Sequence, residues 1–219
     1  MRSESSEMNK ILEEIGLFGV VPVIIIDDAE SSIPLANALI DGGLPVAEVT
    51  FRTKAAKESI KIIAKSFPQM LLGAGTILSI DQVSCAVDSG AKYIVSPGFN
   101  SNVVEHCIKY NIPIIPGIAT PTEIERALEF NLDVVKFFPA EALGGTAYLK
   151  AISAPYGVLK FVPTGGIDEN NLLEYLQFPK VLACGGSWMV KSELIKNKKY
   201  DDIKKLTVSA VNLAKLRNK

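Results

Sequence analysis

The chain has 219 residues, of which 48% are hydrophobic and 21% are charged, as is typical of a globular protein that can bury its own core. Its 23 basic and 24 acidic residues give a formal net charge of -1, so we expect no nucleic-acid partner. Three cysteines without a Cys-x-x-Cys pair argue against a disulfide framework or a zinc cage, and the single histidine, His106, excludes a multi-histidine metal site within one chain.

The N-terminal part of the sequence predicts a helix that leads into a buried strand. Residues 15–26 form the longest apolar stretch, but Gly16, Gly19 and Pro22 interrupt it, and it is shorter than the ~20 residues that span a bilayer. Residues 1–10 are polar and carry charges of both signs, and the apolar stretch lacks the basic lead and the small-residue cleavage site of a secretory signal. We therefore expect an extra N-terminal helix, no membrane partner and a cytoplasmic location, which also suits reduced cysteines.

Short apolar runs recur along the rest of the chain, each followed by turn residues. They begin at Val20, Val46, Leu71, Tyr93, Ile112, Val134, Lys160 and Val181, about 19 to 26 residues apart. This spacing is too long for a hairpin and fits one strand plus one crossover helix. Helical patterns between the runs predict helices over residues 31–40, 53–67 and 201–216, and one that opens at Pro121.

Apolar strands that alternate with helices predict an α/β protein with a parallel sheet buried on both faces. Eight such units close a (β/α)8 TIM barrel, which we expect as a single domain over residues 1–219. An open doubly wound sheet is the alternative. It usually carries Gly-x-Gly-x-x-Gly after its first strand, whereas Asp27 and Asp28 follow the first strand here.

Lys136, inside the sixth apolar run, is the strongest single indication of chemistry. One interpretation is a lysine whose stem packs while its amine reaches water. A barrel strand is covered by helices on its outside, which favours an amine that points inward instead. Burial disfavours the charged form of an amine, and a neutral amine is the nucleophile that attacks a carbonyl carbon.

The second run carries Glu48, Thr50 and Arg52, which share one strand face because side chains alternate. An ion pair between Glu48 and Arg52 is one interpretation. The other gives each residue its own role, with Arg52 binding a substrate carboxylate and Glu48 transferring protons. The presence of Lys136 favours the second interpretation.

Paired glycines follow the seventh and eighth runs, at residues 165–166 and 185–186. In (β/α)8 barrels a phosphate often binds at these two turns, against backbone N–H groups that glycine leaves accessible. A tight turn without a ligand would explain either pair alone. Two pairs at the two expected strands predict a phosphate site.

Several stretches together resemble the family of 2-keto-3-deoxy-6-phosphogluconate (KDPG) aldolases, some of which also act on 4-hydroxy-2-oxoglutarate (KHG). They are EVTFR at 48–52, GAGT at 73–76, SPGF at 96–99, PGIATP at 116–121, VKFFPAE at 135–141, PTGGI at 163–167 and GGSW at 185–188. The resemblance implies a class I aldolase on a homotrimeric (β/α)8 barrel. It implies no cofactor and no metal, because a protonated imine accepts the electrons.

The resemblance also implies a role for each matched residue. Lys136 matches the Schiff-base lysine, and Glu48 matches the general acid and base. The residues expected to contact substrate are Arg52 and Thr76 at the carboxylate, Pro97, Phe138 and Thr164 nearby, and Gly165, Gly166, Gly185, Gly186 and Ser187 at the phosphate. The expected reaction is cleavage of KDPG, a small-molecule 2-keto acid phosphate, to pyruvate and glyceraldehyde 3-phosphate, and of KHG to pyruvate and glyoxylate.

Other functions remain open on the sequence alone. The galactonate-derived phosphate differs from KDPG at one hydroxyl, which Thr164 is placed to contact. A phosphosugar isomerase or epimerase would keep the glycine turns but would not need an amine. A barrel that only binds a phosphorylated metabolite would keep phosphate affinity and show no turnover.

Overall fold

The computed structural model describes residues 5–218 as an alternation of parallel strands and helices. The strands are β1 (Val20–Ile24), β2 (Val46–Thr50), β3 (Leu71–Gly75), β4 (Tyr93–Val95), β5 (Ile114–Ile115), β6 (Gly117–Ile118), β7 (Val134–Phe137), β8 (Lys160–Pro163) and β9 (Cys184–Gly186). The α-helices are α1 (Ser5–Phe18), α2 (Ser32–Asp41), α3 (Ala56–Ser66), α4 (Ile80–Asp88), α5 (Ser101–Lys109), α6 (Pro121–Glu129), α7 (Gly145–Ser153), α8 (Leu172–Leu176), α9 (Ser192–Lys196) and α10 (Tyr200–Lys215). Short 3-10 helices are η1 (Ala29–Ser31), η2 (Glu141–Leu143), η3 (Trp188–Val190) and η4 (Leu216–Asn218).

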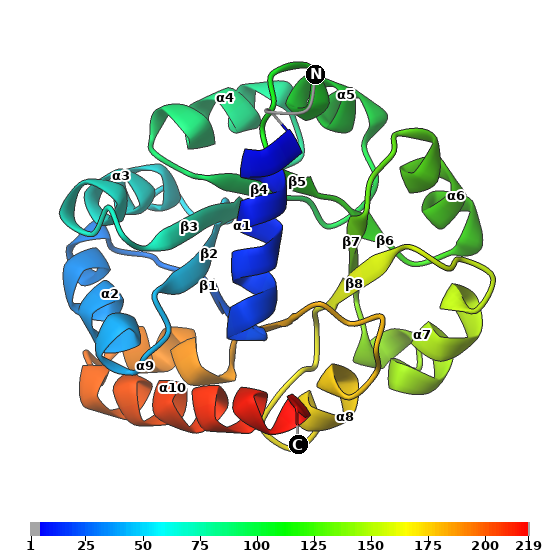
Figure 1. Cartoon of the computed structure of the whole chain (residues 1–219). Helices are drawn as coiled ribbons and strands as arrows, with labels where there is room; N and C mark the ends of the chain where they lie inside the picture. Colours follow the sequence, from blue (N-terminus) through cyan, green and yellow to red (C-terminus); the bar gives the residue numbers. More distant parts are fainter. Residues whose placement is uncertain (1–4, 219) are drawn as a thin grey trace.

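The strands form two parallel sheets with the orders β5-β4-β3-β2-β1-β9 and β6-β7-β8. Pro116 alone separates β5 from β6, and its carbonyl accepts a 2.8 Å hydrogen bond from the Lys136 N–H of β7. At the other edge, a bridge joins Thr164, just after β8, to Gly185 in β9. The strands lie around a common centre with helices outside them, and α1 crosses one end (Figure 1).

The starts of β1 to β4, β7 and β8 agree with the predicted runs, and two starts differ. The fifth strand, expected from Ile112, begins at Ile114 and is divided at Pro116, because proline has no N–H to give to the ladder. The eighth, expected from Val181, begins at Cys184, since Val181 makes only an isolated bridge.

The helices follow the predicted ranges with small shifts at their starts. The helix expected over residues 31–40 is preceded by η1 and corresponds to α2. The helix expected over residues 53–67 corresponds to α3, which begins three residues after the expected start. Thr53 belongs to the preceding turn, where its hydroxyl donates a 2.5 Å hydrogen bond to the Ile26 carbonyl. Pro121 does open α6, and Thr120 with Glu123 forms a capping box there.

The predicted N-terminal helix is present as α1, and it closes the amino-terminal end of the strands (Figure 1). Ile15 of α1 is 1% exposed and joins the main hydrophobic core. Every residue of β2 and β3 is buried, so these strands have helices or core on both faces. Within residues 5–218, no helix is both long enough and apolar enough to cross a membrane.

A single glycine allows β4 to pack against β2 across β3. The ring of Tyr93 lies directly over Gly73, where an added Cβ would overlap it. The Tyr93 hydroxyl thereby reaches past β3 and donates a 3.1 Å hydrogen bond to the Ala47 carbonyl in β2. Glycine at position 73 is therefore required by close packing inside the ring of strands.

Replacing Gly73 with alanine should destabilise the fold by about 1–3 kcal/mol, because the added methyl must displace a ring that is itself tightly packed. Urea unfolding would measure the loss. Gly157→Ala is the control, since nothing lies within 4 Å of a Cβ at that exposed position. Equal stabilities of the two variants would contradict this packing argument.

Candidate active site

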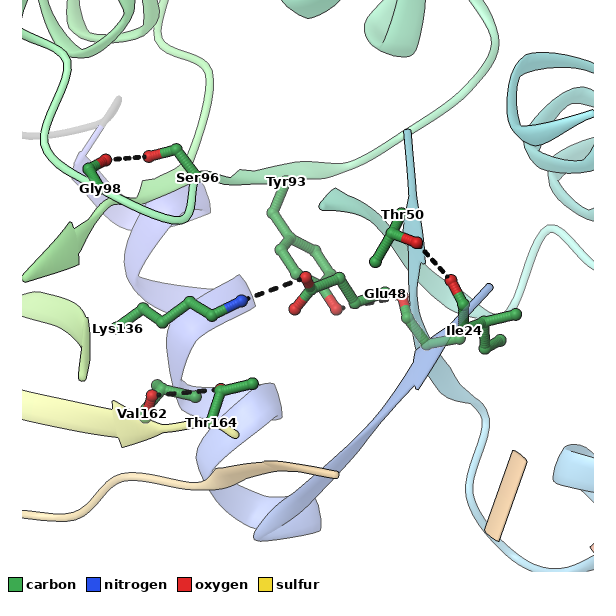
Figure 2. Close-up of polar contacts among 10 residues, drawn as sticks. Ile24, Glu48, Thr50, Tyr93, Ser96, Gly98, Lys136, Val162 and Thr164 are labelled. Atoms are coloured by element: carbon green, nitrogen blue, oxygen red, sulfur yellow. Dashed lines mark hydrogen bonds and ion pairs between the residues drawn. The ribbon is translucent and has the colours of Figure 1, made fainter. Parts of the chain in front are cut away.

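Lys136 of β7 and Glu48 of β2 point toward each other inside the ring of strands (Figure 2). Lys136 Nζ lies 3.4 Å from Glu48 Oε1. Only 6% of Lys136 and 4% of Glu48 are exposed, so water screens the two charges little. The predicted inward amine is confirmed in this geometry, and a proton can pass between the two side chains without an intermediary.

The room for the Glu48 carboxylate comes from Gly75 at the end of β3. A Cβ at position 75 would overlap the Glu48 carboxylate. The two glycines of the 73–76 motif therefore make space for two larger side chains of neighbouring strands, Tyr93 and Glu48. This role follows from packing between strands, which no local pattern in the sequence reveals.

Tyr93 lies beside Glu48 and forms part of the same interior cluster (Figure 2). Burial raises the pKa of Tyr93 well above its usual value of 10.0, and the neighbouring Glu48 raises it further. The hydroxyl therefore stays protonated and remains a donor to β2. Sequence reasoning missed this residue, because one tyrosine in an apolar run has the appearance of ordinary core.

Two other predicted residues lie next to the pair. Lys136 Nζ is 5.2 Å from the centroid of the half-buried Phe138 ring, a distance at which an ammonium interacts favourably with an aromatic face. Thr164 is 6% exposed, and a small cavity is lined by Thr164, Lys136, Glu48 and Gly185. The structure thus brings together residues of β2, β7 and β9 and residues that directly follow β7 and β8.

Pro97 follows β4 and is half-buried. Its carbonyl oxygen lies so close to Gly117 that a Cβ there would overlap it, which joins this turn to β6. Nearby, the buried Ser96 hydroxyl donates a 2.8 Å hydrogen bond to the Gly98 carbonyl (Figure 2). Pro97 therefore has a well-supported backbone at the carboxyl-terminal end of its strand.

Arg52 does not lie on the strand face where the sequence placed it. β2 ends at Thr50, so Arg52 belongs to the following turn, where it is exposed. The Thr50 hydroxyl donates a 2.8 Å hydrogen bond to the Ile24 carbonyl of β1. The alternative ion pair with Glu48 is also wrong, because Glu48 pairs with Lys136, and Arg52 forms no ion pair within residues 5–218.

Thr76, directly after β3, has a φ of 59° and is half-buried. A β-branched residue rarely adopts this left-handed conformation, since its side chain crowds the backbone. Such strain is found where the surrounding structure holds a turn in a particular shape, often at a functional site. Thr76 therefore lies in a constrained turn at the carboxyl-terminal end of β3.

The glycine turn after β8 has a conformation that needs glycine. Gly165 and Gly166 have φ values of 99° and 83°. Their carbonyls accept hydrogen bonds from the Glu141 N–H, at 3.0 Å, and from Asn171 Nδ2, at 2.9 Å. Within residues 5–218, the N–H groups of Gly165 and Gly166 donate to no protein acceptor.

The second glycine pair does not form the predicted turn after a strand, because Gly185 and Gly186 lie within β9 and pair with Val21 and Pro22 of β1. This pair is also more tightly packed than the first. Gly185 adjoins the Thr164 side chain, and Gly186 adjoins the Trp188 ring, so that a Cβ at either position would overlap its neighbour. Ser187 is exposed at the start of η3 and makes no capping hydrogen bond. The bridge between Thr164 and Gly185 places β9 beside the turn at Gly165 and Gly166.

Metal-ligating side chains do not gather at this site. In the part of the chain that the structure describes, no three His, Cys, Asp or Glu residues are grouped so that they would hold a metal ion. His106 lies on α5, half-buried, with its ring 4.7 Å from that of Tyr110. The charged groups at the centre of the site are therefore Lys136 and Glu48.

A family model described as KDPG and KHG aldolase matches residues 11–206, which include every site residue above. The chain belongs to this family. A 2-dehydro-3-deoxy-phosphogluconate aldolase of Treponema pallidum is 54% identical over 86% of this chain and 90% of its own length. The KHG/KDPG aldolase of Escherichia coli K12 is 42% identical over 90% of this chain and 92% of its own length.

Solved structures agree with this assignment. A crystal structure of KDPG aldolase from Legionella pneumophila has a TM-score of 0.88 and 40% sequence identity, covering 91% of this chain and 97% of that one. That protein was captured with pyruvate as a covalent carbinolamine intermediate at low pH. The family predicted from the sequence motifs is therefore confirmed.

The buried pair makes a testable contribution to stability. Lys136→Met should destabilise the KDPG/KHG aldolase fold by about 3–5 kcal/mol, because it leaves a buried carboxylate without a partner. Adding Glu48→Gln should recover part of that loss. Urea unfolding of the wild type, both single variants and the double variant gives the coupling between the two sites. Additive losses would show that the two charges do not interact.

Proposed function

We propose that the protein is a class I aldolase that cleaves KDPG to pyruvate and glyceraldehyde 3-phosphate, with Lys136 as the Schiff-base nucleophile. The observation that carries the proposal is the buried Lys136 amine 3.4 Å from the Glu48 carboxylate, in a chain of the KDPG/KHG aldolase family. Cleavage of KHG to pyruvate and glyoxylate is a second activity of the same site, favoured by the likeness to an aldolase named for both substrates.

Formation of the imine begins with a proton transfer. Glu48 accepts a proton from the Lys136 ammonium, and the neutral amine attacks the 2-keto carbon to form a carbinolamine. Glu48 then returns the proton to the carbinolamine hydroxyl, which leaves as water. The product is a protonated imine between Lys136 and the substrate, and Glu48 is again a carboxylate.

Cleavage uses the protonated imine as the electron acceptor. Glu48 takes the proton from the hydroxyl on the fourth carbon, and the bond between the third and fourth carbons breaks. The electron pair flows to the imine nitrogen, giving an enamine, while the aldehyde product leaves. Glu48 then protonates the third carbon, and water hydrolyses the resulting imine to release pyruvate and restore the amine.

The remaining residues bind the two charged ends of the substrate in this proposal. Arg52 and Thr76 contact the carboxylate, with the exposed Arg52 guanidinium able to bind both of its oxygens. Pro97, Phe138 and Thr164 contact the carbon chain near the imine. The phosphate is held at Gly165, Gly166, Gly185, Gly186 and Ser187. This is supported by the N–H groups of Gly165 and Gly166, which donate to no protein acceptor within residues 5–218, and by the bridge that joins Thr164 to Gly185.

We propose further that the two sheets make up one closed (β/α)8 barrel in a single domain of 219 residues. The continuity through Pro116 and the bridge between Thr164 and Gly185 support closure. A homotrimer is supported by the family and by apolar side chains on the surface at Leu78, Ile80 and Val87, 54%, 39% and 36% exposed. Three free cysteines suit the cytoplasm as its location.

The nucleophile can be identified by trapping. Incubation with pyruvate and borohydride should reduce an imine and attach the three-carbon unit to Lys136, because this amine lies inside the ring of strands beside a proton acceptor. Mass spectrometry of peptides would locate the adduct. Lys136→Ala should abolish trapping and cleavage, while Lys150→Ala and Lys160→Ala should trap as the wild type does. An adduct at either of those lysines would refute the assignment.

The separate roles of Glu48 and Arg52 predict different kinetic defects. Glu48→Gln should lower kcat by about 10²–10⁴-fold while pyruvate still binds, since general acid–base catalysis contributes about that factor. Arg52→Lys should instead raise KM, because an ammonium cannot replace the paired N–H donors of a guanidinium. Steady-state kinetics with KDPG, and pyruvate affinity by calorimetry, would separate the two effects. Near-normal kinetics in both variants would assign these residues to structure alone.

A further inference from the structure

Glu141 and Tyr175 form a hydrogen-bonded pair beside the glycine turn that follows β8. The hydroxyl of Tyr175, in α8, donates to Glu141 Oε1 at the start of η2. Tyr175 is 1% exposed. Burial raises the pKa of Tyr175 above its usual value of 10.0, and its hydrogen bond to Glu141 raises it further, so the hydroxyl remains a donor at neutral pH.

The glycine turn rests on Glu141 through both backbone and side chain. The Glu141 N–H donates a 3.0 Å hydrogen bond to the Gly165 carbonyl, next to a 2.8 Å bond from the Ala140 N–H to the Thr164 carbonyl. A Cβ at Gly166 would lie only 2.6 Å from Cβ and Cγ of Glu141. The stem of Glu141 therefore forms the surface against which the turn packs.

The same turn is held from its other side by the start of α8. Asn171, the residue before α8, donates a 2.9 Å hydrogen bond from Nδ2 to the Gly166 carbonyl. Its Oδ1 accepts a 2.9 Å hydrogen bond from the Asp168 N–H. Because Tyr175 belongs to this same helix, the contacts form a closed circuit that runs from the turn to Glu141, Tyr175, Asn171 and back to the turn.

The carboxylate of Glu141 has the same sign of charge as a phosphate, so its place near an anion site needs an explanation. The first residue of α7, Gly145, lies beside it, where a Cβ would be 3.0 Å from Glu141 Oε1. The amino-terminal end of a helix carries a partial positive charge, which stabilises a carboxylate. This helix end and the Tyr175 hydroxyl therefore anchor the carboxylate, while the stem and backbone of Glu141 support the turn.

We propose that Glu141 and Tyr175 are positioning residues that hold the Gly165 and Gly166 amides in the orientation that binds the phosphate of the substrate. This inference rests on the proposed aldolase function. Glycine has the largest choice of backbone conformations, so two adjacent glycines would be disordered without restraint, and ordering them on binding would weaken affinity. The circuit through α8 removes that freedom before the substrate arrives.

The test compares a phosphorylated with an unphosphorylated substrate of the same site. Tyr175→Phe removes one hydroxyl, and Glu141→Ala removes both the acceptor and the stem. Each should raise KM for KDPG and the inhibition constant of inorganic phosphate about three- to tenfold, in keeping with the loss of a hydrogen bond to a charged group. The kcat for KDPG should stay within twofold of the wild-type value, and so should kcat and KM for KHG.

A conservative variant and a matched control make the result specific. Glu141→Gln keeps an amide oxygen as the acceptor for Tyr175, so its KM for KDPG should lie between those of the wild type and Glu141→Ala. Tyr156→Phe is the control, because the Tyr156 hydroxyl donates a 3.0 Å hydrogen bond to Glu125, another Tyr–Glu pair. Its kinetics with both substrates should be those of the wild type.

Each contrary result has a distinct meaning. An equal rise in KM for KDPG and for KHG would show that Glu141 and Tyr175 only stabilise the fold. An unchanged inhibition constant of phosphate would show that they do not act on the turn. Either result would overturn the inference. Absence of KDPG cleavage by the wild-type chain would overturn the proposed function instead. Calorimetric titration of the wild type and Tyr175→Phe with inorganic phosphate would then decide the positioning role without turnover, and equal dissociation constants would refute it.

Discussion

Two opposite charges taken out of water are stable only when they face each other, and the contact between Lys136 and Glu48 imposes this condition on the fold. The two residues come from different sheets, so both sheets must face one interior. A neighbouring strand must leave room for the carboxylate, which it does with Gly75. The buried ion pair and the packing of the strands are in this sense one arrangement, because a shift of β2 relative to β7 would expose or separate the charges.

Beyond the carboxyl-terminal ends of β7 and β8 the strand ladder has ended. There the two segments are held together by hydrogen bonds between their loops. The N–H groups of Ala140 and Glu141, after β7, bond to the carbonyls of Thr164 and Gly165, after β8. The strand that bears Lys136 is therefore tied directly to the turn whose amides are free. In the proposed reaction, a substrate with a keto group at Lys136 and a phosphate at the turn needs a constant distance between these two places, and the hydrogen bonds between the loops restrain that distance.

Local patterns in the sequence were sufficient for most of the fold. Strand starts follow from apolar runs at regular spacing, and the start of α6 follows from Pro121, because both signals depend on residues close in the chain. The fifth strand was less predictable, since an apolar run does not reveal that Pro116 divides it. Arg52 was misplaced for a related reason: strand alternation was extended two residues beyond Thr50, where β2 ends.

The candidate site likewise has residues that local sequence patterns reveal and residues that only tertiary contacts reveal. The family could be predicted from motifs whose residue types and spacing are specific, and Lys136 stood out because a lysine inside an apolar strand requires a reason. The tertiary structure was needed to show that Glu48, 88 positions away, is the partner of that lysine. It also decided that Tyr93 and Gly75 shape the surroundings of Glu48, and that Glu141 supports a glycine turn. These contacts join segments far apart in the chain, and their distances depend on strand register and packing that no local pattern records.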